Sequence, residues 1–329
     1  MRRRDFIKAV AGSAMTWPLT ARAQQSKPMP VIGFLGSQSP DVLPNALRAF
    51  HQGLSEVGYA EGRNATIEYR WAQGQNDRLP ALVADLVHRQ ATVLVASDST
   101  PAALAAKAAT TTIPIVFVSA ADPVQAGLVA SLSRPGGNVT GVTTLNVEVA
   151  SKRLELLHEL VPTAATIAFL VNPTNPVLAD TLTRDIQAAA GRLGIKLHVF
   201  QVSTEREFDT AFETIGQLHA DGLVIGTDIF FNSRIEQLAA LAVRQALPAV
   251  YQSREFVAAG GLLSYGASLT DASRQAGIYT GRILRDEKPS DLPVQRLTSI
   301  ELFINLKSAK ALGITVPLPM SGRADEVIE

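Results

Sequence analysis

Short apolar runs alternate with longer amphipathic stretches along most of this chain, and that alternation constrains the fold more than any other feature. Most of the short runs are four to seven residues long and rich in β-branched side chains, as strands buried on both faces should be. These runs are Val31–Gly36, Ala65–Trp71, Thr92–Ala96, Ile115–Val118, Ile167–Val171, Lys196–Gln201, Gly222–Gly226, Ala249–Tyr251, Gly261–Tyr265 and Val294–Leu297. The stretches with helical spacing are Leu43–Val57, Asp77–Arg89, Pro101–Ala109, Pro123–Leu132, Val147–Leu160, Val177–Leu193, Glu205–His219 and Ser233–Gln245. The pattern predicts an α/β fold with parallel sheets and helices on both faces of each sheet.

The alternation is interrupted once, near the middle of the chain. Residues 133–142 read Ser-Arg-Pro-Gly-Gly-Asn-Val-Thr-Gly-Val, a composition that favours turns. After this segment the pattern restarts with a helix and the strand Ile167–Val171. A length of 329 residues suggests about two domains. We therefore interpret the segment as a crossover between two Rossmann-like α/β lobes; the alternative is a surface turn within one large sheet.

The first 23 residues have the three parts of an export signal. A basic start is followed by the apolar run Ala9–Leu19 and by Ala21-Arg22-Ala23, a small-x-small cleavage pattern. Arg3–Lys8 reads Arg-Arg-Asp-Phe-Ile-Lys and closely resembles the twin-arginine pattern. The alternative is a short basic amphipathic helix of the folded protein. We expect a twin-arginine-type signal over residues 1–23, cleaved after Ala23, and a protein located in the periplasm.

Charge and cysteine content narrow the classes of function. The whole chain has 30 basic and 30 acidic residues, but the leader holds five basic residues and one acidic residue. The remaining 25 basic and 29 acidic residues give the predicted mature chain a net charge of −4. Such a balance argues against nucleic-acid binding, which needs a basic surface. The absence of cysteine excludes disulfides, thiolate metal sites and a lipid-anchored cysteine, so free diffusion in the periplasm is expected.

Five polar residues followed by proline mark predicted strand ends as helix starts. They are Ser39-Pro40, Thr100-Pro101, Asp122-Pro123, Asn172-Pro173 and Asn175-Pro176. Ser, Thr, Asp and Asn are good N-caps, and proline is favoured at the first helical position. Ligands of open α/β sheets bind at the carboxyl ends of the strands, where helix N-termini offer free backbone N–H groups. Capping without any ligand is the alternative for each dipeptide taken alone.

The candidate ligand-binding residues lie at or near the ends of predicted strands. They are Gly36, Ser37, Ser97, Asp98, Ser99, Thr100, Ser119, Ala120, Asp122, Asn172, Thr174, Asn175, Thr227, Asp228, Tyr251 and Tyr265. Hydroxyl groups and helix N-termini suit a carboxylate, and an opposing acid, either Asp228 or Asp122, suits an ammonium group. Aromatic walls could come from Tyr251, Tyr265, Phe230, Phe231 and Trp71; a place in the core is the alternative for each.

Sequence signatures of common enzyme classes are missing. The chain contains no G-x-x-x-x-G-K-[ST] phosphate loop, no G-x-G-x-x-G dinucleotide fingerprint and no G-x-S-x-G nucleophile elbow. Its five histidines lack metal-ligand spacing. No run approaches the roughly 20 apolar residues that span a bilayer. We therefore expect a binding protein without cofactor, metal or catalytic residues.

Several motifs, taken in order, resemble one protein family. They are Val31–Leu35 (VIGFL), Thr100-Pro101, Ile113–Phe117 (IPIVF), Asp122–Val124 (DPV), Gly127–Val129 (GLV), Pro135–Gly141 (PGGNVTG), Ile283-Leu284, Lys288-Pro289, Leu292–Val294 (LPV) and Ile304–Gly313 (INLKSAKALG). In this order the chain resembles periplasmic substrate-binding proteins of ABC transporters, and more narrowly the family related to the tryptophan-binding TrpX proteins. The resemblance covers nearly the whole predicted mature chain.

That resemblance implies a type I periplasmic-binding fold with the ligand held between two lobes. One lobe would comprise residues 30–141 plus 267–296 and the other 142–266 plus 297–329. The chain would cross between them at Gly141–Thr144, near Tyr265 and near Leu297. Characterised relatives bind aromatic amino acids. The resemblance implies that the loops at Ser99-Thr100 and Ser119–Asp122 would hold the zwitterion and that Asp228 would hold its ammonium.

The same resemblance implies a function in uptake. The expected protein is a monomer that captures a small ligand such as an amino acid or a related carboxylate. Hinge closure around the ligand would then present it to an ABC permease in the inner membrane. Two alternatives remain open: a periplasmic sensor that presents the closed form to a receptor kinase, and a periplasmic enzyme using Asp98 or Asp228 as an acid or base.

Overall fold

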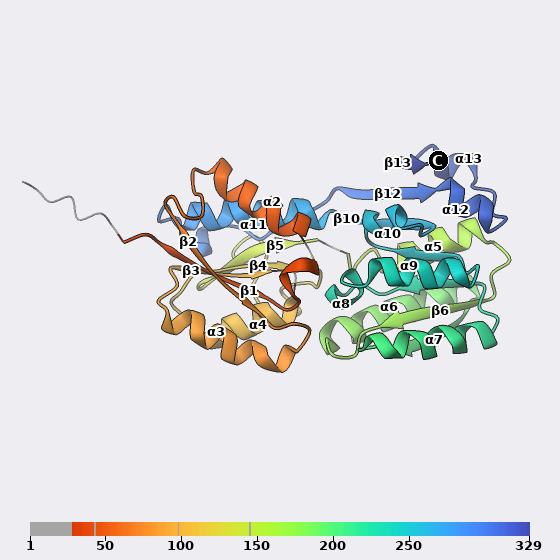
Figure 1. Cartoon of the computed structure of the whole chain (residues 1–329), viewed down its shortest axis with the longest axis horizontal. Helices are drawn as coiled ribbons and strands as arrows, with labels where there is room; N and C mark the ends of the chain where they lie inside the picture. The colour runs from red at the N-terminus through yellow and green to blue at the C-terminus, as the bar shows by residue number, and fades with distance from the viewer. Residues whose placement is uncertain (1–27, 43, 98, 145) are drawn as a thin grey trace, which may run out of the picture.

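The computed structural model describes residues 28–42, 44–97, 99–144 and 146–329. The predicted export signal and Asp98 lie outside the described residues. Two α/β lobes stand side by side, each built on its own sheet (Figure 1). The α/β class and the parallel sheets predicted from the alternation are confirmed.

The first sheet has six parallel strands in the order β11-β5-β4-β3-β1-β2. Their bounds are β1 Val31–Gly36, β2 Thr66–Trp71, β3 Val93–Ser97, β4 Ile115–Ser119, β5 Val139–Thr143 and β11 Gln295–Arg296. Alternate side chains of these strands point to opposite faces, and each face is covered by helices. The helices of this lobe are α2 Pro44–Glu56, α3 Leu79–His88, α4 Thr100–Ala109 and α11 Leu269–Ile283, with the 3₁₀ turns η1 Pro40–Val42, η2 Asn76–Arg78 and η3 Pro289–Asp291.

The second sheet has seven strands in the order β13-β12-β10-β9-β8-β6-β7, and only the β10–β12 pair is antiparallel. The strands are β6 Thr166–Val171, β7 Lys196–Gln201, β8 Gly222–Ile225, β9 Ala249–Tyr251, β10 Leu263–Ala267, β12 Ile300–Asn305 and β13 Glu326–Ile328. The helices are α5 Ala150–Leu160, α6 Pro176–Leu193, α7 Glu205–Gln217, α8 Ile229–Asn232, α9 Ile235–Arg244, α10 Arg254–Ala258, α12 Leu306–Ala311 and α13 Leu318–Ser321.

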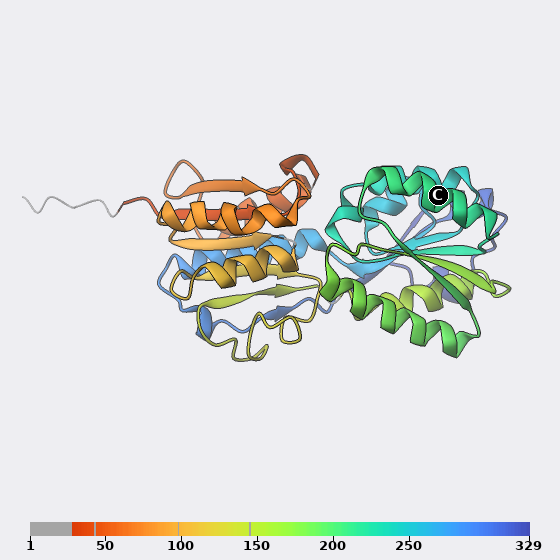
Figure 2. The ribbon, with the colours of Figure 1, turned by 90° about the horizontal axis from the view of Figure 1, so that it is seen from below.

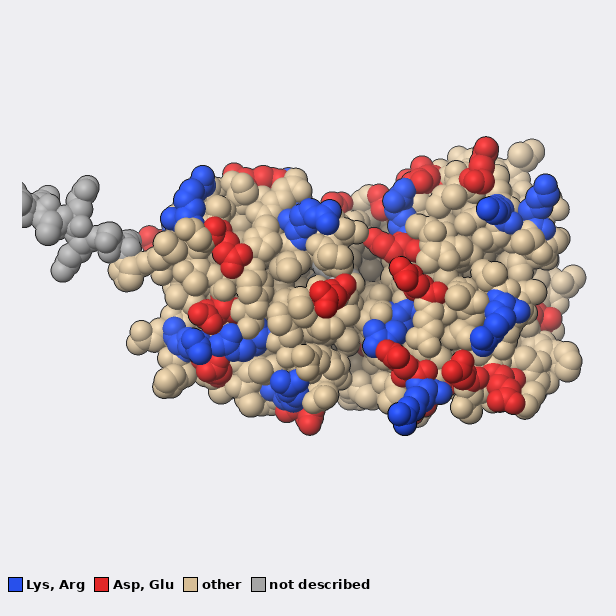
Figure 3. Space-filling view, in the orientation of Figure 1, with Lys and Arg blue, Asp and Glu red and all other residues tan. Residues whose placement is uncertain are grey.

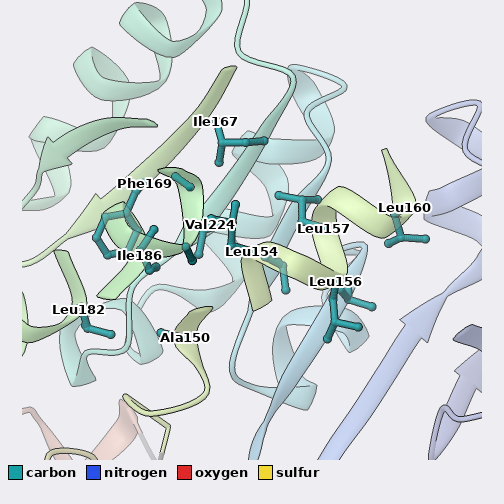
Figure 4. Close-up of a cluster of buried hydrophobic side chains, with 14 of the residues drawn as sticks. Ala150, Leu154, Leu156, Leu157, Leu160, Ile167, Phe169, Leu182, Ile186 and Val224 are labelled. Atoms are coloured by element: carbon teal, nitrogen blue, oxygen red, sulfur yellow. The ribbon is translucent and has the colours of Figure 1, made fainter. Parts of the chain in front are cut away.

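Helices cover both faces of both sheets, as Figure 2 shows from below. In the first lobe, α2 and α11 bury their apolar sides on one face, while α3 and α4 cover the other. In the second lobe, α5 and α6 pack on Ile167 and Phe169 (Figure 4). The alternate residues of β6, Ala168 and Leu170, face α7 and α9 on the opposite side of the sheet. Because successive side chains of a strand point to opposite faces of the sheet, β6 contributes to both hydrophobic cores of the lobe.

Helices α2 and α11 approach each other unusually closely through two glycines. A Cβ added at Gly53 would lie 1.9 Å from the carbonyl oxygen of Arg274, and one added at Gly277 would lie 2.2 Å from that of Phe50. No side chain longer than hydrogen fits at either position without separating the two backbones. The two glycines thus fix where α11, the helix after β10, packs against the first lobe.

We expect Gly53→Ala to lower the free energy of unfolding by roughly 1–3 kcal/mol, because overpacking must push α2 off α11. A matched control is Gly191→Ala in α6, where an added Cβ meets nothing within 4 Å. That change should be neutral or stabilising by up to about 1 kcal/mol, through helix propensity. Urea unfolding measures both variants, and equal stabilities would contradict the close packing.

One predicted helix was wrong, and several elements were missed. The predicted helix Pro123–Leu132 is a series of turns, because the Asp122 carboxylate accepts the backbone N–H groups of Val124 and Gln125, at 2.8 and 3.2 Å, and Gly127 adopts a φ of +72°. The turn-rich segment ends in a buried strand, β5, so the boundary suggested between residues 141 and 142 falls inside β5. The antiparallel strand β12 and the long helix α11 had not been predicted.

The chain passes between the two sheets at three places. It leaves the first sheet after Thr143, returns between Ala267 at the end of β10 and Leu269 at the start of α11, and leaves again between Arg296 and Ile300. Predicted crossings at Gly141–Thr144, near Tyr265 and near Leu297 lie within a few residues of these places. Three adjacent connections are the covalent basis of a hinge.

Candidate functional site

A cleft of about 1260 Å³ lies between the two lobes. Its walls are formed by η1 and the start of α2, and by the segments that follow strands β4, β5, β8, β9 and β10. Charged side chains of both signs lie on the two lobes on either side of their junction (Figure 3). Because the strands of each sheet are largely parallel, their carboxyl ends bring polar residues from many parts of the chain to this one cleft.

The first lobe contributes hydroxyl groups to the cleft. Thr100 Oγ1 and Ser119 Oγ are 2.9 Å apart and share a hydrogen bond. Ser99 caps α4 by accepting from the backbone N–H of Ala102 at 3.2 Å. Thr100, Ser119 and Ala120 all line the cleft. The ends of β3 and β4 thus lie together, as the sequence predicted. The hydroxyl groups of Thr100 and Ser119 there suit a carboxylate.

The second lobe contributes a buried carboxylate, Asp228, which is 6% exposed and lines the cleft. Its Oδ1 accepts from the backbone N–H of Phe230 at 2.9 Å and from Asn172 Nδ2 at 2.8 Å. Its Oδ2 accepts from Asn175 Nδ2 at 3.4 Å. Burial raises the pKa of Asp228, and these hydrogen bonds partly oppose the rise. Every one of these partners is neutral, so the negative charge of Asp228 has no countercharge among them.

Arg153 lies behind the cleft and connects the segments that form its floor. The side chain is 0% exposed and donates to Asn146 O at 2.8 Å, Thr227 Oγ1 at 2.7 Å and Tyr265 O at 3.1 Å. Burial lowers the pKa of Arg153 to about 10. Asn146 also binds the backbone of Ala267, accepting its N–H at 2.7 Å. Arg153 and Asn146 therefore join the first crossing of the chain to the second.

Several predicted site residues lie outside the main cleft. Gly36, Ser37 and Ser97 line a smaller neighbouring pocket that also contains Trp71 and Ile229. Asp122 caps a turn and does not line the cleft. Asn172 donates to Asp228 and accepts from the backbone N–H of Thr174, and neither Asn172 nor Thr174 lines the cleft. Asp98 lies outside the described residues.

The predicted aromatic walls are mostly core. Tyr251 is buried among Phe230, Phe231 and Phe256, and its hydroxyl donates to Asn232 Oδ1 and Asp228 O, at 2.5 and 3.2 Å. Burial and the nearby negative charge of Asp228 raise the pKa of Tyr251. Tyr265 packs against the other core of that lobe. Of these five aromatic residues, Trp71 lines the smaller pocket, and none lines the main cleft.

Sequence reasoning missed many polar residues at or behind the cleft, among them Thr144, Asn146, Gln252 and Arg153. Gln252 directly follows the predicted strand Ala249–Tyr251, so the strand-end rule would have found it. Arg153 had a different signal, a charge on the apolar face that α5 forms with Ala150, Leu154 and Leu157. Thr144 and Asn146 follow β5, a strand that had not been predicted.

The described residues contain no group of three or more His, Asp or Glu side chains arranged to hold a metal ion. None of the helices within the described ranges is both long and apolar enough to cross a bilayer.

Comparisons with known proteins agree with this architecture. Residues 33–328 match the family model for ABC transporter substrate-binding proteins. The chain is 30% identical to a tyrosine-binding protein of Clostridioides difficile over 272 residues, which cover 82% of this chain and 77% of that protein. It also resembles the structure of an ABC domain in complex with L-Trp from Streptococcus pneumoniae, with 27% identity and a TM-score of 0.82 over 91% of this chain and 99% of the other.

A third similar structure bears on the arrangement of the lobes. It is the ligand-free, open structure of a substrate-binding protein from Clostridium difficile, with 25% identity and the same coverage of 91% and 99%, but a TM-score of only 0.63. At nearly equal identity, the present structure is thus closer to the L-Trp complex than to the open form. Direct contacts between the lobes agree with a closed arrangement: Asn76 Nδ2 donates to Thr174 O at 3.4 Å, and Ile229 reaches the pocket of Trp71.

Fold, cleft and sequence similarity lead to one assignment. Two α/β lobes joined by three crossings around a polar cleft are the arrangement of type I periplasmic-binding proteins. The family model covers almost all of the described chain. This protein belongs to the family of ABC transporter substrate-binding proteins.

Proposed function

We propose that this protein captures an amino acid, with an aromatic side chain as the first candidate, and delivers it to an ABC permease in the inner membrane. The observation that carries the amino-acid assignment is Asp228, a buried carboxylate in the cleft whose hydrogen-bond partners are all neutral. An ammonium group supplies the missing countercharge. The hydroxyls of Thr100 and Ser119 on the first lobe suit the carboxylate of the same zwitterion.

The aromatic preference is supported by two relatives rather than by the walls of the cleft. One is named a tyrosine-binding protein and the other is an L-Trp complex. In this chain, Trp71 with Ile229 of the opposite lobe offers an apolar surface beside the main cleft. We propose that an aromatic ligand side chain lies toward this surface.

The proposal also includes the location, oligomeric state and lobe bounds of the protein. Residues 1–23 are a twin-arginine-type signal, cleaved after Ala23, and the mature protein is a monomer in the periplasm. Its lobes comprise residues 30–143 plus 267–296 and residues 144–266 plus 297–329, with the first boundary placed at Thr143, where β5 ends. The cleft binds and releases its ligand without catalysis.

Thermal unfolding of the mature protein with a panel of ligands tests the proposal. An amino acid present at 100 times its dissociation constant should stabilise the folded protein by about 2.7 kcal/mol. We expect tyrosine, tryptophan or phenylalanine to raise the melting temperature, while sugars leave it unchanged. A panel in which sugars act and no amino acid does would overturn the ligand class.

A further inference from the structure

Among the residues that the structure describes, two buried side-chain oxygen atoms of the cleft lining have no hydrogen-bond partner. They are the hydroxyl oxygen of Thr144, whose residue is 2% exposed, and the side-chain carbonyl oxygen of Gln252, whose residue is 8% exposed. Buried polar atoms nearly always have a partner, and leaving one without costs free energy of folding. Thr144 lies on the first crossing, directly after β5, and Gln252 follows β9 in the second lobe, so the two atoms come from different segments of the cleft wall.

Thr144 extends the group of hydroxyls on the first lobe. Its backbone N–H donates to Ser119 O at 3.1 Å, which places it next to the residue whose side chain pairs with Thr100. Its own hydroxyl takes no part in that network. A hydroxyl in this position can donate to an anionic group in the cleft.

Gln252 is held at one end of its amide only. Its Nε2 donates to Asn232 Oδ1 at 3.0 Å, and Asn232 Oδ1 also accepts from the Tyr251 hydroxyl at 2.5 Å. The amide is thereby oriented with Oε1 as a free acceptor. Asp228 and Asn232 line the same cleft, and the Tyr251 hydroxyl connects them by donating to Asp228 O at 3.2 Å.

We propose that Thr144 and Gln252 bind the ligand: the Thr144 hydroxyl donates to its carboxylate, and Gln252 Oε1 accepts a hydrogen bond from its ammonium beside Asp228. The inference rests on the proposed function and deepens it, because it predicts how the site distinguishes its ligands. An α-hydroxy acid of the same shape can donate one hydrogen bond where the ammonium donates three. Gln252 thus favours α-amino over α-hydroxy acids.

The test compares Thr144→Val with Ser273→Ala. The Ser273 hydroxyl is also buried and has no partner among the described residues, but it lies on α11 and does not line the cleft. Neither substitution breaks a hydrogen bond of the ligand-free protein, so neither should lower its stability to urea. Titration calorimetry with L-tyrosine and L-tryptophan should show at least tenfold weaker binding for Thr144→Val and unchanged binding for Ser273→Ala.

Gln252→Met supplies the second measurement. We expect it to reduce the preference for L-tryptophan over indole-3-lactate, its α-hydroxy acid, by about tenfold or more. If Thr144→Val loses both stability to urea and affinity, the residue has a structural role and the inference is overturned. The inference is also overturned if Thr144→Val binds with wild-type affinity and Gln252→Met keeps the wild-type preference. If the wild-type protein binds no amino acid of the ligand panel, the proposed function fails and this inference fails with it.

Discussion

Arg153→Met is expected to lower the free energy of unfolding by about 3 kcal/mol or more and to weaken binding of every ligand in the cleft. The substitution removes the guanidinium donor from Asn146 O and Tyr265 O and one partner of Thr227 Oγ1, while Asn146 O keeps the Thr227 hydroxyl as a donor. Each hydrogen bond from a charged donor contributes about 1.5–3 kcal/mol to stability. Removing the buried charge offsets part of this loss in the free energy of unfolding, since burial disfavours the charged form of Arg153 and lowers its pKa.

The effect on binding follows from what Arg153 holds in place. Asn146 and Thr227 line the cleft, and Asn146 also binds the backbone of Ala267. Without the guanidinium, the first and second crossings of the hinge lose their shared partner. We therefore expect affinity for amino acids and for their deaminated analogues to fall together, which separates this positioning role from direct contact.

A surface arginine provides the control for Arg153. Arg282 forms an ion pair with Glu287 in which both side chains are about two-fifths exposed. Surface pairs of this kind contribute at most about 1 kcal/mol. Urea unfolding of Arg282→Met should therefore lie close to wild type. An Arg153→Met protein as stable as Arg282→Met would show that the three hydrogen bonds of Arg153 contribute little.

The repeating part of the fold could be predicted from sequence because burial on both faces leaves an unambiguous pattern. Strands such as β1 and β7 were predicted with their true ends, since each is a continuous strand pattern bounded by turns. β5 was missed because Gly141 and the preceding glycines read as a turn. In the structure Gly141 is required by packing: a Cβ there would lie 2.2 Å from Phe117 O. The amino-acid composition around Gly141 gives no information about that contact.

The candidate site was predictable only where one rule applied, that polar residues at strand ends meet in the cleft. The rule found Thr100, Ser119 and Asp228 but placed Tyr251 in the cleft, although its ring completes the core. Arg153 could not have been placed, because its partners include a backbone atom more than one hundred residues away and a hydroxyl from a third segment. Long-range contacts of this kind depend on how distant segments of the second lobe pack together.

Asp228→Asn should weaken binding of an amino acid by about thirtyfold to several thousandfold. Losing one partner of a buried charge pair typically costs 2–5 kcal/mol, and each 1.4 kcal/mol is a factor of ten. The fold should survive, because an asparagine oxygen can still accept from Phe230 and Asn172. The Asn175 amide can turn its oxygen toward the new side-chain amide.

The ligand-free Asp228→Asn protein should be as stable as wild type or more stable at neutral pH. The folded-state pKa of Asp228 is raised by burial, so the unfolded chain loses this proton at a lower pH than the folded protein. Stability linked to this group is complete below its unfolded pKa and is lost as the pH rises through its folded pKa. The amide that replaces the carboxylate does not titrate, so urea unfolding of the variant should lack this decline.

Opposite effects on stability and affinity distinguish a ligand-binding carboxylate from a structural one. A carboxylate that served only to cap α8 would, on replacement, leave affinity nearly unchanged. Calorimetry with L-tryptophan and with indole-3-propionate, which lacks the ammonium, separates the two roles. We expect the variant to lose affinity for L-tryptophan while its affinity for indole-3-propionate changes less than about threefold. Equal losses for both ligands would remove Asp228 from the ammonium site, because only one of them carries the charge that Asp228 is proposed to pair.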